Sequence, residues 1–508
     1  MGEETRPRDY RLVPLAGAAW LGVVSALQGW GIAGVLGGEL ALACSWGWVW
    51  LRTDWGKRLR WLGLATGVAL ALGGVAGHLA ARDYRVDPAV QLSDGAQLRA
   101  LVRLDSGVVL RATPWGQPEA VATGSITAVA KGDRWLRSGA QVRLSGSPAV
   151  LLNVGPGTTV RVSGRLERGF WEQPPRVGQV RVRTATVAAE PSAWLRWVGL
   201  VRNRMLDLCA GLPAPAGALV LGMSVGDRQL LDQDLSEAMR VASLTHLTAI
   251  SGTHIAVAMA VISLVIPGWK WVRPLFLLAF LAVLIGVVGP TASVVRAAAM
   301  AALVIVGWWG YRSSQSQVAL AAVVLGIVLL RPWMALQYGF TLSVLATAGI
   351  IFSGTRWADR LGRWSVSRWG KVMGERPLKL GSSAVAVSAA ASLWVLPVLV
   401  TLNPWISLWA IPANVLATPA VAPTTILGLL AATTVTWAPT LADWCAKLAA
   451  LPAGWISRVA QLFASLPAAK LPWPTGPAGP ILAAILVGLV LGTIEFNWGR
   501  TGRHRHGR

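Results

Sequence analysis

The chain has 508 residues, of which 54% are hydrophobic, and its mean hydropathy is +0.53. No soluble globular domain needs so much apolar sequence, so the fold class expected is a polytopic α-helical membrane protein with about 10–12 transmembrane segments. Lys and Arg number 46 against 23 Asp and Glu, a net charge of +23, which positive-inside topology and an anionic cargo would each help to explain.

Hydrophobic stretches predict N-terminal transmembrane helices within residues 1–83. The expected crossings are Leu12–Gly31, Ile32–Leu51 and Trp61–Ala80. The basic loop between the second and the third is expected in the cytoplasm, so the N-terminus is cytoplasmic and the chain after Ala80 is external. Met1–Arg11 is mixed in charge and is not interpreted as a cleavable signal.

A period near two replaces the long apolar runs between residues 84 and 190. It is clear in Leu98–Leu104, Gln141–Leu144 and Gln179–Thr184, which Gly, Pro, Asp and Ser separate. We expect a small, external, all-β domain here, and we interpret Gly157–Glu167 as a strand pair of the OB type.

OB surfaces bind single strands through basic grooves and stacked aromatic rings. The candidates for such binding in this domain are Trp115, Arg134, Trp135, Arg137, Arg168 and Trp171. The alternative is that the aromatic rings fill the barrel core and that the arginines are solvated.

The stretch Ser243–Ile266 has no Lys, Arg, Asp or Glu and is long enough to cross a bilayer. Its first half nevertheless concentrates hydroxyl and imidazole side chains, among them His246, Ser251 and His254. Polar groups at membrane depth are costly and usually face a bundle interior or a water-filled path, which favours a functional lining. The alternative is that they hydrogen-bond neighbouring helices as packing contacts. Before this stretch, Trp194–Leu212 is interpreted as an interfacial helix.

Further crossings follow in close order. They are expected at Pro274–Gly289, Thr291–Trp309, Val318–Leu330, Trp333–Phe352, Ser382–Leu402 and Ile481–Ile494. The loop Arg356–Lys379 holds seven Lys and Arg against two acids and is expected in the cytoplasm, as is the basic tail at residues 500–508. Four prolines in Asn403–Leu430 predict a re-entrant or discontinuous helix near Asn414. Thr440–Pro467 is left open between a crossing and a surface helix.

Arg296 lies near the start of the crossing Thr291–Trp309. A cation at the bilayer centre costs about 2.5–3.5 kcal/mol even on lenient insertion scales. Arg296 must therefore snorkel to the interface, pair, or line a wet path.

Several of these blocks resemble the core of the ComEC family, the inner-membrane DNA-uptake channels of natural competence. The resemblance lies in Gly226-Asp227-Arg228, in the His-Leu-x-Ala-Ile-Ser-Gly-x-His block His246–His254, and in Pro290–Ala297 around Arg296. It extends to Gln337–Ser343, where Thr341 replaces the usual glutamine, and to Ile411–Pro423. The resemblance implies a competence-type channel domain at residues 191–499 and these path candidates: Asp227, Arg228, His246, Ser251, Gly252, His254, Arg296, Gln337, Phe340, Ser343 and Asn414.

The resemblance also implies a function: import of single-stranded DNA through the bacterial inner membrane during natural transformation, with both termini in the cytoplasm. The implied partners are single-stranded DNA, membrane lipid, an external DNA receptor, a separate nuclease and a cytoplasmic ATP-driven helicase or translocase. The metallo-β-lactamase-like domain that many relatives carry has no counterpart here, because no His-x-His-x-Asp-His metal-ligand set is present.

Catalysis is not expected from this chain. It has no Gly-x-x-x-x-Gly-Lys-Ser/Thr loop for ATP, and its cysteines Cys44, Cys209 and Cys445 fit no Cys-x-x-Cys pattern, so no cofactor and no metal are expected. Whether a disulfide forms is left open. Two alternative functions remain: a small-molecule or lipid transporter, and an intramembrane hydrolase with Ser251 as nucleophile and His254 as base, which share a helix face.

Overall fold

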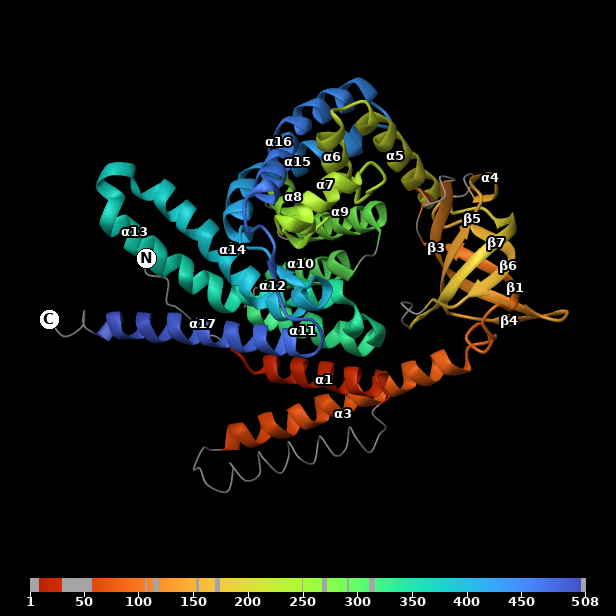
Figure 1. Ribbon diagram of the computed structural model, residues 1–508, viewed down its shortest axis with the longest axis horizontal. Coiled ribbons are helices and arrows are strands. Elements are labelled where there is room, and N and C mark those ends of the chain that lie inside the picture. Colours follow the sequence, from red (N-terminus) through yellow and green to blue (C-terminus); the bar gives the residue numbers. More distant parts are fainter. Residues whose placement is uncertain are drawn as a thin grey trace.

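The computed structural model describes residues 9–29, 57–105, 107–112, 118–151, 155–169, 174–248, 250–266, 272–289, 292–309 and 316–503. In these ranges the chain is mostly helical, and a small separate sheet region lies at one end of the helical part (Figure 1). The second predicted crossing, Ile32–Leu51, falls outside the described residues, as do Trp115 and Trp171.

The N-terminal helices α1 (Leu12–Leu27) and α3 (Lys57–Val86) pack against each other through small residues. A Cβ atom on Gly73 would overlap the carbonyl oxygen of Ala19, and one on Gly22 would overlap that of Leu70. Glycine at these positions therefore lets the two backbones approach closely, as small residues do at helix interfaces in membranes.

The sheet region is a barrel of strands with alternating burial. Its strands are β1 (Gln97–Leu104), β2 (Val109–Ala112), β3 (Pro118–Lys131), β4 (Arg134–Arg137), β5 (Gln141–Gly146), β6 (Thr159–Glu167) and β7 (Arg176–Ala189). Pairing runs β1–β3–β5–β7–β6 and returns to β1, and β5–β7 is the parallel pair. The short helix α4 (Pro148–Leu151) lies between β5 and β6 in the chain.

Burial alternates along β6 as the sequence pattern predicts. Val160, Val162 and Leu166 are buried, whereas Arg161 and Arg165 are exposed. Side chains along a strand point to opposite faces, so each strand supplies both the barrel core and a basic outer face. The interpretation of Gly157–Glu167 as a strand pair is wrong, because this stretch forms the single uninterrupted strand β6.

Helices make up the rest of the described chain. In order they are α5 (Ala193–Ala210), α6 (Ala214–Val225), α7 (Gln233–Val241), η1 (Thr245–Leu247), α8 (Gly252–Val265), α9 (Val272–Val288), α10 (Ala292–Trp309), α11 (Ser316–Leu330), η2 (Pro332–Leu336), α12 (Tyr338–Gly349), the π-helical turn η3 (Ile350–Gly354), α13 (Thr355–Met373), α14 (Glu375–Leu402), α15 (Ala410–Thr434), α16 (Pro439–Ser465) and α17 (Ala478–Arg503). A two-stranded pairing joins β8 (Trp405–Ile406) and β9 (Leu471–Pro472).

Five helices of the described chain are long and apolar enough to cross a membrane. They cover Leu62–Val86, Tyr338–Met373, Glu375–Leu402, Ala410–Thr434 and Ala478–Phe496. Shorter apolar helices include α1, α6, α8, α9, α10 and α11. The long helix α16 is not among the five; it buries an alanine-rich face against α6 and α15 and exposes leucines and tryptophans on the other.

The stretch Ser243–Ile266 is divided: Ser243 has φ +59°, a 3₁₀ turn follows, and α8 begins only at Gly252. Two sequence expectations about helix continuity are wrong. Arg356–Lys379 is a helical hairpin formed by α13 and α14 rather than a loop. α15 runs unbroken through Asn414 despite Pro419 and Pro423.

Buried side chains of α5, α6, α7, α15 and α16 form one continuous hydrophobic core. Cys209 of α5 and Cys445 of α16 belong to this core, and both have free thiols. A second core joins α1, α11 and α12, and a third joins α8, α9 and α10.

The contact of α1 with α3 can be tested by adding one methyl group. Gly73→Ala is expected to destabilise the full-length protein by about 1–3 kcal/mol, because the new Cβ cannot fit against the Ala19 backbone. The measurement is the thermal unfolding midpoint in detergent. Gly67→Ala on the same helix meets open space and should be neutral or slightly stabilising through helix propensity. Equal midpoints for both variants would contradict the packing account.

Candidate functional site at the start of helix α8

The sequence Ser251-Gly252-Thr253-His254 starts α8 as a reciprocal capping box. The Nδ1 atom of His254 accepts the backbone N–H of Ser251 at 2.8 Å, and it lies 3.0 Å from the Ser251 Oγ atom. Glu or Gln normally fills the third position of this motif, and a histidine with an unprotonated Nδ1 can replace it. The spacing of Ser251 and His254 therefore has a structural cause.

The same hydrogen bond assigns the tautomer of His254. Because Nδ1 accepts the backbone N–H, the proton of the neutral ring belongs on Nε2, which becomes a donor. The side chain is 2% exposed, and Nε2 has no hydrogen-bond partner in the described part of the chain. Nδ1 is already engaged by the backbone, so this geometry does not favour His254 as a general base for Ser251.

Arg296 brings three helices together. It belongs to α10 and is 5% exposed; its Nε donates to the Ser343 Oγ of α12 at 2.8 Å, and its Nη1 contacts the Met300 sulfur at 3.3 Å. A Cβ atom on Gly252 would lie 3.2 Å from its Nη2. The guanidinium therefore lies against the first turn of α8, and Ser251, Gly252, His254, Arg296 and Ser343 form one cluster, here called the Arg296 cluster.

The charge in this cluster has no partner of opposite sign. No Asp or Glu among the described residues forms a salt bridge with Arg296. The N-terminus of α8 adds positive character, because a helix N-terminus is equivalent to roughly half a positive charge. Buried apolar side chains of α8, α9 and α10 form a core that includes Ala297, next to Arg296, and electrostatic interactions are strong in such a medium.

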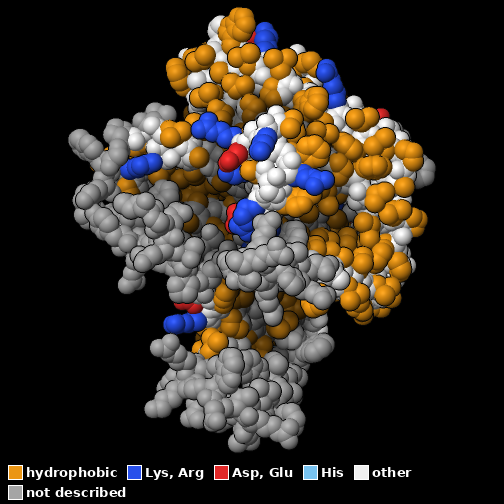
Figure 2. All heavy atoms as spheres, turned by 90° about the vertical axis from the view of Figure 1, so that its left-hand side faces the viewer, with side chains coloured by type: hydrophobic (Ala, Val, Ile, Leu, Met, Phe, Trp, Pro, Cys, Tyr) orange, Lys and Arg blue, Asp and Glu red, His pale blue; other side chains and the backbone are white. Residues whose placement is uncertain are grey.

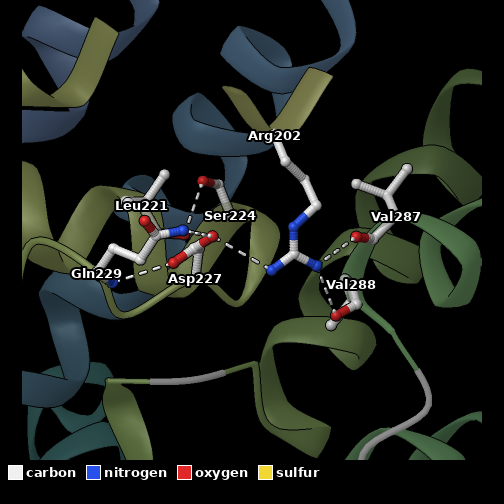
Figure 3. Close-up of polar contacts among 7 residues, drawn as sticks. All are labelled: Arg202, Leu221, Ser224, Asp227, Gln229, Val287 and Val288. Atoms are coloured by element: carbon white, nitrogen blue, oxygen red, sulfur yellow. Dashed lines mark hydrogen bonds and ion pairs between the residues drawn. The ribbon is translucent and has the colours of Figure 1, made fainter. Parts of the chain in front are cut away.

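Asp227 belongs to a second polar cluster, shown in Figure 3. Its Oδ2 lies 3.3 Å from Nη2 of Arg202 on α5 and accepts a hydrogen bond from the side-chain amide of Gln229, while its Oδ1 accepts the backbone N–H of Gln229. The Nη1 of Arg202 donates to the carbonyl oxygens of Val287 and Val288 at 3.3 and 3.4 Å. Arg202 therefore caps the C-terminus of α9 while Asp227 holds its guanidinium in place.

The segment from Gly222 to Asp227 also lies against the chain that leads into α8. A Cβ on Gly222 would lie 2.5 Å from the carbonyl oxygen of Thr248, and one on Gly226, which has φ +73°, would lie 3.2 Å from the Val288 Cγ1. This short segment therefore contacts two places: the chain just before α8, and the end of α9, which precedes α10 in the chain. We call Gly222–Asp227 together with Arg202 the bracket of the Arg296 cluster.

The other path candidates lie elsewhere. Phe340 is fully buried and packs on the Trp20 ring at 5.2 Å, so it belongs to the core of α1, α11 and α12. The Asn414 side chain donates to the Ala410 carbonyl within α15. Arg228, His246 and Gln337 are exposed. Arg202 was not among the candidates, and its signal was weak: it is one of three arginines in a helix interpreted as interfacial.

Three of the barrel candidates lie on the short strand β4, at the β3–β4 turn, which points away from the helices (Figure 1). These are Arg134, Trp135 and Arg137; Trp135 is 44% exposed, and the Arg161 guanidinium lies 5.7 Å from its ring centre. Arg168 instead donates to the carbonyls of Val90 and Leu92, so it fastens a loop. Four further arginines of the barrel are exposed and were not among the candidates, although they alternate with apolar residues along their strands. They are Arg99, Arg103, Arg161 and Arg165.

The bracket can be tested through its ion pair. Asp227→Ala leaves Arg202 largely buried without its carboxylate and is expected to cost about 3 kcal/mol of unfolding free energy. Unfolding of the full-length protein in detergent measures this. Glu190→Ala removes the exposed partner of Arg196 and should cost less than about 1 kcal/mol. An Asp227→Ala variant as stable as Glu190→Ala would contradict the structural role.

Comparisons with known proteins match the part of the chain that holds this site. The family model described as "Competence protein" matches residues 223–498, more than half of the chain, including the whole Arg296 cluster. ComE operon protein 3 of Bacillus subtilis (strain 168) is 24% identical over 235 residues, which cover 42% of this chain and 30% of that protein. The match therefore spans less than a third of that relative's length. No solved structure matches the chain. The chain belongs to the competence protein family, the family of ComEC.

Proposed function

We propose that this protein is a cell-membrane channel that passes single-stranded DNA inward during natural transformation. The observation that carries the proposal is Arg296: a buried guanidinium without a carboxylate partner in the described chain, where three helices of the family-matched region meet. A buried cation is costly unless an opposite charge reaches it. A strand with a charge on every phosphate supplies that charge as it passes.

The distribution of charge along the molecule supports a membrane orientation. The barrel lies at one end, and the α13–α14 hairpin and the end of α17 point to the other (Figure 1). The helix through α12 and α13 has 36 residues, about 54 Å, against a hydrocarbon core of about 30 Å, so it would extend beyond the bilayer. Its exposed cations are Arg356, Arg363, Arg368 and Lys371, and those of α14 are Arg376 and Lys379.

Figure 2 looks at that hairpin end and shows several Lys and Arg side chains near its middle, with hydrophobic side chains gathered above and to the right of them. By the positive-inside rule this end is cytoplasmic, which puts the barrel outside. Both termini are then cytoplasmic, and the protein is a multi-pass protein of the bacterial inner membrane.

The external barrel is proposed to be OB-like and to receive the strand. Its support is a closed ring of antiparallel pairs with one parallel pair, β5–β7, and a helix between β5 and β6. The exposed Trp135 beside Arg161 is a stacking ring next to a cation, the combination that binds single strands without sequence preference.

The alternatives have less support. A small-molecule or lipid transporter does not call for an unpaired buried arginine, and a hydrolase would need a free base at His254. The chain lacks nucleotide-binding and metallo-β-lactamase motifs, so an external DNA receptor, a nuclease and a cytoplasmic ATP-driven translocase are proposed as separate partners.

The proposal predicts the phenotype of a single substitution. Arg296→Leu should reduce transformation by linear DNA roughly 10–100-fold, while expression and membrane insertion stay normal. A decrease of this size is what the loss of one hydrogen bond to a charged group produces. Transformants per recipient at matched protein level are the measurement. The control is Arg273→Leu, since Arg273 donates to the Ser263 carbonyl at the other end of α8.

Normal transformation in the Arg296→Leu strain would contradict a role in the path. Ser251→Ala distinguishes a channel from a hydrolase. A channel should lose uptake only in part, because a hydroxyl that lines a path is replaceable. A loss as complete as that of a gene deletion would favour the hydrolase, in which the nucleophile provides most of the rate enhancement.

A further inference from the structure

We propose that the first turn of α8 forms, with Arg296 and His254, a binding site for one backbone phosphate of the strand. This inference rests on the proposed function and deepens it: it assigns the ligand of the Arg296 cluster and the donor that each residue contributes. The ligand is a phosphodiester anion, and the site holds one such group at a time.

The helix terminus supplies the first donors. The capping box uses the N–H groups of Ser251 and His254, so those of Gly252 and Thr253 remain without an acceptor inside the helix. Ser251 and Gly252 are half-buried and Thr253 is exposed, which leaves this turn open to an incoming group. Backbone N–H groups at a helix N-terminus are a common anion site, though alone they would not identify one here.

Arg296 is the second and independent observation. Its guanidinium, almost entirely buried, lies over Gly252 at the positive end of α8, so two features of the same sign face each other. This arrangement is unfavourable when empty and becomes favourable when an anion contacts both of them. Glycine at position 252 allows the close approach of the guanidinium to this turn, since a Cβ there would already lie 3.2 Å from the Nη2 atom.

His254 is the third donor, and it is neutral. Its Nδ1 is occupied by the Ser251 N–H, so Nε2–H is the donor, and this buried atom has no partner in the described ranges. A guanidinium, an imidazole N–H and two backbone N–H groups are matched to the several oxygens of a phosphate. Ser343 only orients the guanidinium through Nε and is a positioning residue.

The roles of Arg296 and His254 differ in a measurable way, because only Arg296 carries charge. The affinity of a single strand falls with salt, and each phosphate neutralised by a cation contributes about 0.7 to the slope of log K against log salt. Loss of Arg296 should lower that slope by about 0.7, whereas loss of the His254 donor should lower the affinity and leave the slope unchanged.

The experiment uses the full chain in lipid nanodiscs and a fluorescent single strand of about 15 nucleotides, titrated at several salt concentrations. Arg296→Gln should weaken binding about tenfold and reduce the slope, and Arg296→Lys should keep the slope. His254→Gln should weaken binding about threefold at an unchanged slope, since glutamine still fits the capping box. Arg273→Gln should match the wild type, because Arg273 belongs to α9 and contacts only the far end of α8.

A second strand, with uncharged methylphosphonate linkages, identifies the ligand group. The difference between the wild type and Arg296→Gln should vanish with this strand. If the difference is equal for charged and uncharged strands, or if Arg296→Gln keeps the full slope, the phosphate site is overturned. If inorganic phosphate binds in an Arg296-dependent way while strand binding ignores Arg296, the site belongs to a free anion and the proposal is likewise overturned.

These outcomes separate the site from the function. Strand binding that is indifferent to Arg296 and His254, together with loss of transformation in the gene deletion, removes the phosphate site and keeps the channel. Transformation that survives the deletion removes the channel itself. Should Arg296→Gln fail to insert in the membrane, Arg296→Lys and His254→Gln still decide the phosphate site.

Discussion

The burial of the Arg296 guanidinium is the constraint on which the arrangement of α8, α10 and α12 depends. Moving an ion out of water costs several kcal/mol even after the protein relaxes. The described structure offsets that cost only with neutral contacts, to the Ser343 hydroxyl and the Met300 sulfur. In the proposed channel, an anion completes this site, and a passing polyanion supplies it transiently.

A site of this kind depends on accurate placement of its helix starts. Arg202 caps the end of α9, and Asp227 holds Arg202, while Gly222 lies against the chain that enters α8. The bracket thus holds both the chain that enters α8 and the end of α9, which precedes α10. This gives a physical reason for the Gly-Asp pair outside the cluster: Gly226 lies against Val288 at the end of α9, and Asp227 holds the arginine that caps that end.

Much of the site could be predicted from sequence, because its chemistry is unusual for a membrane segment. Hydroxyls and imidazoles in an apolar stretch indicated Ser251 and His254, and a cation near the start of a crossing indicated Arg296. The resemblance to ComEC linked them to Ser343, although it also included Phe340, which is a core residue. Alternation located the strands, but one continuous strand was divided into a pair, because periodicity does not show where a turn lies.

What the sequence could not show depends on long-range contacts. Nothing local in α5 marks Arg202 as the cap of a helix more than eighty residues away. Charge density favoured a loop at Arg356–Lys379, yet α13 and α14 pack on each other and remain helical. The prolines of α15 suggested a break, but tertiary packing against α6 and α16 keeps that helix continuous.

The most direct measurement of the central claim is contact between the strand in transit and the Arg296 cluster. A photo-crosslinking amino acid in place of Ala297, which lies beside Gly252 and Arg296, would be activated during uptake of labelled DNA. A cross-link to single-stranded DNA that forms only while uptake proceeds, and that a residue on the exposed outer face of α16 such as Leu448 does not give, is the result expected. Efficient uptake with no cross-link at position 297 would contradict a path through this cluster.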